Sequence, residues 1–166
     1  MDDARREARR GRPGAGALSR VRRGPGPVAR RRAGPAPPDQ APDLPRLEAF
    51  LAALPRGQPV AVEFKNPAWR SEALHAALAA AGAALCVTDT EEDATPLVAT
   101  ADFGYLRLRR DDYDDTALAR WAERIAAQPW RAAYVFFRHE DTARGTGLAA
   151  RLLELAGGDA ASPALR

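Results

Sequence analysis

The 166 residues suffice for one ordinary domain but fall short of the roughly 250 residues that a complete eight-stranded β/α barrel usually needs. A hydrophobic fraction of 46% excludes a chain that is disordered throughout, and the single cysteine excludes an internal disulfide. The net charge of +3 combines two unlike parts, because residues 1–46 hold 12 Arg against 5 acidic residues while residues 47–166 hold 13 Lys and Arg against 17.

Residues 1–42 alternate arginine clusters, such as Arg30, Arg31 and Arg32, with Gly-Pro pairs, and they contain almost no large apolar side chains. Such a segment cannot bury enough surface to offset its conformational entropy, which predicts that it is disordered. The positive charge lies here and is therefore no nucleic-acid signature of the folded part. No apolar stretch suits a secretory signal or a membrane span, so we expect a cytoplasmic protein without a membrane partner.

From about Asp43 onward, helical and strand patterns alternate along the chain. The expected elements are a helix capped by Asp43, a strand at 60–64, a helix capped by Ser71, a strand at 84–87, a strand at 103–108, a helix from Asp115, a strand at 132–137 and a helix that carries Leu148, Leu152 and Leu155. The link at 88–102 is acidic and polar, and only Pro96-Leu97-Val98 suggests a helical turn there.

Strands separated by helices are typical of βαβ units and a parallel sheet. Within the strands the residues alternate, so that Leu106 and Leu108 lie on the face opposite to Tyr105, Arg107 and Arg109. One apolar face and one face with charged and aromatic residues is typical of a barrel wall, whereas a flat doubly wound sheet is more often apolar on both faces. We therefore predict the α/β class and an arc of about four βα units of a TIM-like β/α barrel.

Four stretches of this pattern resemble a known family. They are Glu63-Phe64-Lys65-Asn66-Pro67-Ala68-Trp69, Phe103-Gly104-Tyr105-Leu106-Arg107-Leu108-Arg109, residues 118–125 (LARWAERI) and residues 134–141 (YVFFRHED) with the helix that follows. In this order and spacing they resemble the YecE-like family, domain of unknown function 72. The resemblance implies that residues 43–157 are the C-terminal half of the family's barrel, between a disordered segment at 1–42 and a flexible C-terminus at 158–166.

The chain departs from the family pattern in two respects. Arg109-Arg110 stands where many members have His-Gly, and residues 138–141 replace a turn that bears Asn and Asp. The family's opening Gly-x-Ser-Gly-Trp strand and its Glu-bearing second strand have no counterpart. We therefore expect a truncated or frame-disrupted copy without independent activity, in which residues 1–42 are read from the wrong frame of a GC-rich gene.

Barrel sites lie at the carboxyl ends of the strands, and this rule selects the candidate residues. The candidate catalytic residues are Glu63, Asp89, Arg107, His139 and Asp141, and the candidate substrate-binding residues are Lys65, Asn66, Trp69 and Arg109. Carboxylates and a histidine at one mouth could act as general acid and base, or ligate a metal. No metal site is assigned and the cofactor is unknown, because the chain has no P-loop, dinucleotide fingerprint, zinc-ligand spacing or serine nucleophile elbow.

Each candidate has a structural alternative. Glu63, across from Arg107, is equally consistent with an interior ion pair. Residues 139–141 are typical of a helix start, where acidic groups interact favourably with the helix dipole. Asp89 is consistent with a solvated acidic loop, and Trp69 with a lid over the core as much as with stacking on a sugar or base.

Three classes of function stay open. An enzyme-type barrel cut in half would be inactive and poorly soluble by itself, or would self-associate through its open edges. A nucleic-acid-associated protein would contact phosphate through its arginine-rich tail with a steep salt dependence, but the tail lacks aromatic residues and the folded part is acidic. A small α/β binding module with an open four-stranded sheet would need no further strands. The sequence reveals neither a substrate nor a reaction.

Overall fold

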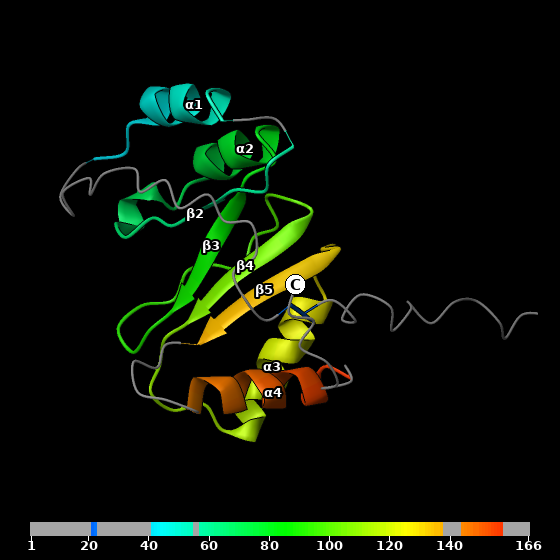
Figure 1. Cartoon of the computed structure of the whole chain (residues 1–166). Helices are drawn as coiled ribbons and strands as arrows, with labels where there is room; N and C mark the ends of the chain where they lie inside the picture. The colour runs from blue at the N-terminus through cyan, green and yellow to red at the C-terminus, as the bar shows by residue number, and fades with distance from the viewer. Residues whose placement is uncertain (1–20, 23–40, 55–56, 138–143, 158–166) are drawn as a thin grey trace, which may run out of the picture.

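The computed structural model describes residues 21–22, 41–54, 57–137 and 144–157. Within these residues, one sheet has the strand order β1-β5-β4-β3-β2, and every neighbouring pair is parallel. The elements are β1 (Val21–Arg22), α1 (Leu44–Ala52), β2 (Ala61–Val62), η1 (Pro67–Trp69), α2 (Glu72–Ala80), β3 (Ala84–Asp89), β4 (Phe103–Leu108), α3 (Asp115–Ala126), β5 (Ala132–Phe137) and α4 (Arg144–Leu155). From β2 to β5, strands that follow one another in the chain are neighbours in the sheet, as in the wall of a β/α barrel (Figure 1).

The helices begin where the sequence places their caps. The side chain of Asp43 accepts a hydrogen bond from the Arg46 amide at the start of α1, and Ser71 accepts one from the Leu74 amide at the start of α2. Each bond satisfies an amide that the first helical turn leaves without a partner. None of the described helices combines the length and the apolar character needed to cross a membrane.

Strands β4 and β5 have the predicted bounds, but β2 is shorter than the predicted strand at 60–64. In the described part of the chain, β2 pairs only with β3, so its outer side lacks the second ladder that would hold a longer strand. The helical turn predicted at 96–98 is also wrong, because this segment has no helical structure. It runs toward Thr100, whose hydroxyl binds the backbone of Ala83 and Leu85 beside β3.

Helices cover one face of the sheet. On that face, Val87, Leu106 and Val135 pack against the apolar sides of α3 and α4. Nearer to β2, Val62 and Leu85 pack against α1 and α2. Burial of each large apolar side chain contributes about 1.5–3 kcal/mol, so these two clusters are the main source of stability.

The opposite face, called the interior face below, is lined by small and aromatic side chains. Ala84, Cys86 and Tyr105 are buried on it, and half-buried Tyr134 and Phe136 pack against them. This cluster contains no residue from any described helix. The predicted alternation between an apolar, helix-covered face and a second face of different composition is therefore confirmed for β3 to β5.

Strand β1 comes from the range that was predicted to be disordered, and the rest of residues 1–40 lies outside the described residues. Val21 and Arg22 pair in parallel with Ala133 and Tyr134 of β5. The first strand of a closed β/α barrel occupies this position beside the last one. Within the described sheet, β1 and β2 are therefore the two edges.

Candidate functional site

Three of the predicted site residues meet on the interior face, at the carboxyl ends of the strands. Glu63 directly follows β2, Arg107 lies near the end of β4, and Arg109 directly follows β4. Arg107 Nη1 donates a hydrogen bond to Glu63 Oε2, and Arg109 Nη1 lies 3.9 Å from Glu63 Oε1. Because β3 lies between β2 and β4, the long arginine side chains reach across one strand to meet the carboxylate.

Cys86, on the intervening strand β3, lies under this ion-paired group. Its side chain is buried, and burial raises the pKa of the thiol to about 12. The nearby Glu63 carboxylate acts in the same direction, while Arg107 and Arg109 partly oppose it. The thiol is therefore protonated at neutral pH, and it offers no anionic nucleophile or metal ligand there.

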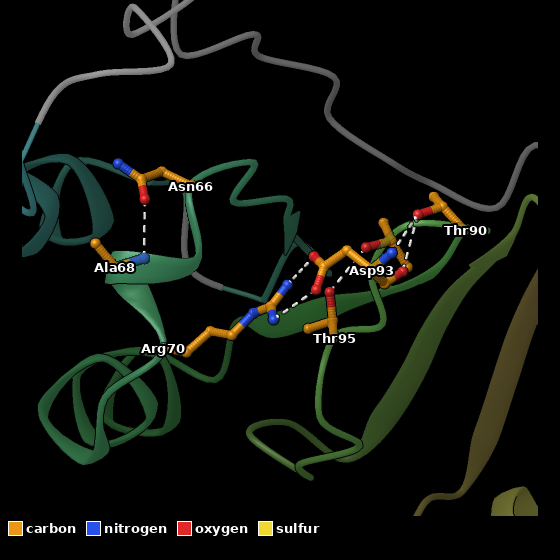
Figure 2. Close-up of polar contacts among 7 residues, drawn as sticks. Asn66, Ala68, Arg70, Thr90, Asp93 and Thr95 are labelled. Atoms are coloured by element: carbon orange, nitrogen blue, oxygen red, sulfur yellow. Dashed lines mark hydrogen bonds and ion pairs between the residues drawn. The ribbon is translucent and has the colours of Figure 1, made fainter.

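Three predicted substrate-binding residues lie in the segment that follows β2. Lys65 is exposed. Asn66 accepts a hydrogen bond from the Ala68 amide at 2.8 Å and so caps η1 (Figure 2). The ring of Trp69 lies 5.0 Å from that of Phe64 and packs on the cluster formed by α1 and α2. Trp69 therefore covers the core, which is the structural alternative stated for it.

Asp89 is separated from the other site residues. It follows Leu85 and Val87 on the helix-covered face, where it is 7% exposed and accepts a hydrogen bond from the Tyr113 hydroxyl at 2.9 Å. Burial, more than this bond, raises the pKa of Tyr113. The interpretation of Asp89 as part of a solvated loop is wrong, and the alternation within β3 was the signal that could have shown it.

The backbone oxygen of Asp89 accepts a hydrogen bond from the Arg109 amide at 2.7 Å. This bond continues the pairing of β3 with β4 by one position beyond the last residue of β4. Asp89 therefore helps to place Arg109 while its carboxylate faces away from Glu63.

His139 and Asp141, the remaining predicted catalytic residues, fall in 138–143, outside the described residues. Their contribution to an acid–base set stays a prediction. Across the described ranges, no three side chains of His, Cys, Asp or Glu lie close enough together to hold a metal ion.

An ion pair that was not predicted from the sequence ties the loop after β2 to the loop after β3. Arg70 Nη1 donates to Asp93 Oδ1 at 2.8 Å, and Nη2 binds Oδ2 (Figure 2). Hydrogen bonding to Arg70 holds the pKa of the Asp93 carboxyl below its usual range. Thr90, three residues earlier, binds the backbone N–H and C=O of Asp93 through its hydroxyl. The Thr-x-x-Asp spacing could have predicted this turn, but not its partner Arg70.

Residues 35–165 match the family model described as Protein of unknown function DUF72. The chain belongs to the DUF72 family. This confirms the resemblance found in the sequence, for which YecE-like is another name. No curated protein matches this DUF72 chain.

Solved structures show the fold of this DUF72 member. A DUF72 family protein from Thermotoga maritima has 19% identity and a TM-score of 0.58, over 73% of this chain and 55% of that protein. A DUF72 family protein from Enterococcus faecalis has 13% identity and a TM-score of 0.51, over 69% of this chain and 53% of that protein. The chain thus spans about half the length of these relatives. They are TIM-like barrels, which confirms the predicted α/β half-barrel class.

Proposed function

We propose that this chain supplies one side of a DUF72 barrel site, built on Glu63, Arg107 and Arg109, and that it has no independent activity. One observation carries the proposal: these side chains meet at the carboxyl ends of parallel strands, on the face that the described helices leave uncovered. Sites in β/α barrels occupy this position and draw on several strands around the ring. The described strands provide one part of such a ring.

The three residues have different roles in this proposal. Glu63 is the candidate general acid or base. Arg107 is a positioning residue, because its hydrogen bond fixes the carboxylate. Arg109 is the candidate substrate-binding residue, since its guanidinium is further from Glu63 than that of Arg107 and its side chain is a third exposed. His139 and Asp141 remain candidates to complete the acid–base set.

The chain spans about half the length of its solved DUF72 relatives. The outer side of β2 has no strand partner among the described residues, and parallel edges of this kind invite pairing. We propose that copies of the chain self-associate through this edge and thereby shield the half-buried aromatic residues of the interior face.

Sedimentation velocity on the purified full-length chain over a range of concentrations tests this proposal. We expect dimers or larger species that dissociate on dilution. The variant Ala61→Lys places a charge on the interior side of edge strand β2 and should weaken association, whereas Ala76→Lys on the exposed side of α2 should not. A compact, cooperatively unfolding monomer at all concentrations would contradict the proposal.

A further inference from the structure

Positive charge outnumbers negative charge around the ion-paired group. Among the described residues, a single carboxylate, that of Glu63, faces both Arg107 and Arg109. Lys65, two residues further on, is exposed and forms no ion pair with any described residue. The carboxylate of Asp89 lies on the other face with Tyr113, so it does not neutralise this excess.

Arg109 also has hydrogen-bond donors that its contact with Glu63 does not use. Its Nη1 lies 3.9 Å from Glu63, which allows electrostatic attraction but is too long for a hydrogen bond. Its Nε is buried and has no hydrogen-bond partner in the described part of the chain. A guanidinium carries five donors in a planar fork that matches the geometry of a carboxylate or phosphate.

The two arginine side chains are partly exposed and partly covered. The side chains of Arg107 and Arg109 are each 32% exposed, so each is in contact both with solvent and with the protein. The partial shelter strengthens their attraction for an anion relative to a fully exposed arginine. Cys86 beneath them is neutral at neutral pH and contributes no opposing charge.

Aromatic side chains continue the surface beside the arginines. Phe136 is the cross-strand partner of Arg107, and its ring lies 5.0 Å from that of Tyr105 on the interior face. Phe136 is half-buried, so part of its ring is available for contact. A planar or apolar group could lie on the exposed part of the Phe136 ring while a charged group reaches the arginines.

We infer that Arg109, supported by Arg107, binds the oxyanion group of a small organic ligand, a phosphate or a carboxylate, whose apolar body lies against the exposed part of Phe136. This inference rests on the proposed location of the site and adds the chemical class of its ligand. Glu63, held by Arg107, then lies next to the bound oxyanion group.

The test is a titration of the isotope-labelled full-length chain with inorganic phosphate, acetate and phenyl phosphate, followed by amide chemical shifts at constant ionic strength. We expect saturable shifts at the end of β4, and tighter binding of phenyl phosphate than of inorganic phosphate. The phosphate and acetate titrations show which oxyanion is preferred. Absence of saturable shifts with all three anions would overturn the inference.

Two variants locate the binding group. Arg109→Gln keeps the backbone bond to Asp89 and should weaken binding about tenfold or more, since hydrogen bonds to charged groups contribute at least that factor. Arg131→Gln removes an exposed arginine paired with Asp102 before β4 and should bind as the wild type does. Equal binding by Arg109→Gln and wild type would overturn the assignment to Arg109.

The outcomes separate this inference from the proposed half-site. A compact monomer that binds phosphate through Arg109 would contradict self-association and leave the ligand class standing. A self-associating chain that binds none of the three anions would contradict the ligand class alone.

Discussion

At Gly104, in β4, a single neighbouring side chain dictates the residue. A Cβ added there would lie 2.5 Å from Cε3 and Cζ3 of Trp130, an approach that real Cβ atoms do not make. Trp130 is buried in the cluster formed with α3 and α4, so its rigid indole cannot swing away into solvent. The sheet and the indole therefore pack together only because this position has no side chain.

Gly104→Ala should accordingly lower the free energy of unfolding by about 1–3 kcal/mol, the usual penalty of overpacking. Urea unfolding followed by circular dichroism measures the effect. Gly147→Ala in α4 is the matched control, because nothing lies within 4 Å of an added Cβ there and alanine favours the helix by about 0.5–1 kcal/mol. A Gly104→Ala variant as stable as the wild type would show that Trp130 moves.

The buried thiol of Cys86 should make the free energy of unfolding depend on pH in the alkaline range. The pKa of its thiol rises from 9.0 to about 12 on folding, so the folded form stays protonated where the unfolded form ionises. Its stabilising contribution is therefore complete below about pH 9 and declines as the pH rises toward 12. The unfolding free energy should therefore fall by about 2 kcal/mol by about pH 10.5, at about 1.36 kcal/mol per pH unit.

The measurement compares the unfolding free energy of wild type and Cys86→Ala at neutral pH and at about pH 10.5. The alanine variant carries no thiol, so the difference between the two proteins isolates the contribution of Cys86 from that of tyrosines and lysines. We expect the wild type to lose more stability than the variant. Equal losses of unfolding free energy in the wild type and the variant would mean that Cys86 ionises freely in the folded chain.

The Arg70–Asp93 ion pair fixes the positions of two loops relative to each other. It joins the segment after η1 to the turn after β3 (Figure 2). Because Glu63 follows β2, the neighbouring parallel strand, the pair lies at the same end of the sheet as Glu63. On the other side of the turn, Thr88 and Thr95 share a hydrogen bond between their hydroxyls. The ion pair ties the two loops together beyond the carboxyl ends of β2 and β3, and the threonine bond closes the base of the second loop.

Asp93→Asn should lower the unfolding free energy at neutral pH by no more than about 1 kcal/mol, because the pair is partly exposed and screened by solvent. The pKa of Asp93 is lowered on folding, so this contribution is present above its usual value of 3.8 and is lost as the pH falls through the lower folded value. Urea unfolding near pH 7 and near pH 2 should therefore show a difference between variant and wild type only near pH 7. Asp112→Asn, at an exposed position, is the control.

At the scale of the whole sheet, the described helices pack on one face, and none of them contributes to the cluster on the other. Strands β2 to β5 are neighbours in the sheet in chain order, and the fold matches about half of the Thermotoga maritima and Enterococcus faecalis relatives. A closed barrel buries its interior face against the strands opposite. We expect self-association of the chain to bury this face in a similar way.

The composition of residues 1–42 leads to a separate prediction about the gene. Runs of Arg, Pro, Gly and Ala arise when GC-rich DNA is read in the wrong frame. We expect a neighbouring frame upstream of the codon for Asp43 to encode strands of the DUF72 type, including a Gly-x-Ser-Gly-Trp segment. Sequencing the locus and translating all three frames decides the matter, and a locus without such a frame would contradict the prediction.

The sequence alone determined the elements whose signals are local. The alternation in β4 and β5 and the caps Asp43 and Ser71 each depend on residues a few positions apart, and all were found where predicted. The same alternation placed Glu63 opposite Arg107, so the ion pair between them could be stated as an alternative in advance.

Tertiary structure alone decided the contacts between segments that share no periodic pattern. The partner of Asp93 is Arg70, 23 positions away, and the partner of Asp89 is Tyr113, 24 positions away. Trp69 likewise could be assigned to the core only once α1 and α2 were seen beside it. Periodicity specifies which way a residue faces within its own strand or helix. The contact that the residue makes there depends on which other segments the loops bring next to it. That arrangement is fixed only when the whole sheet packs.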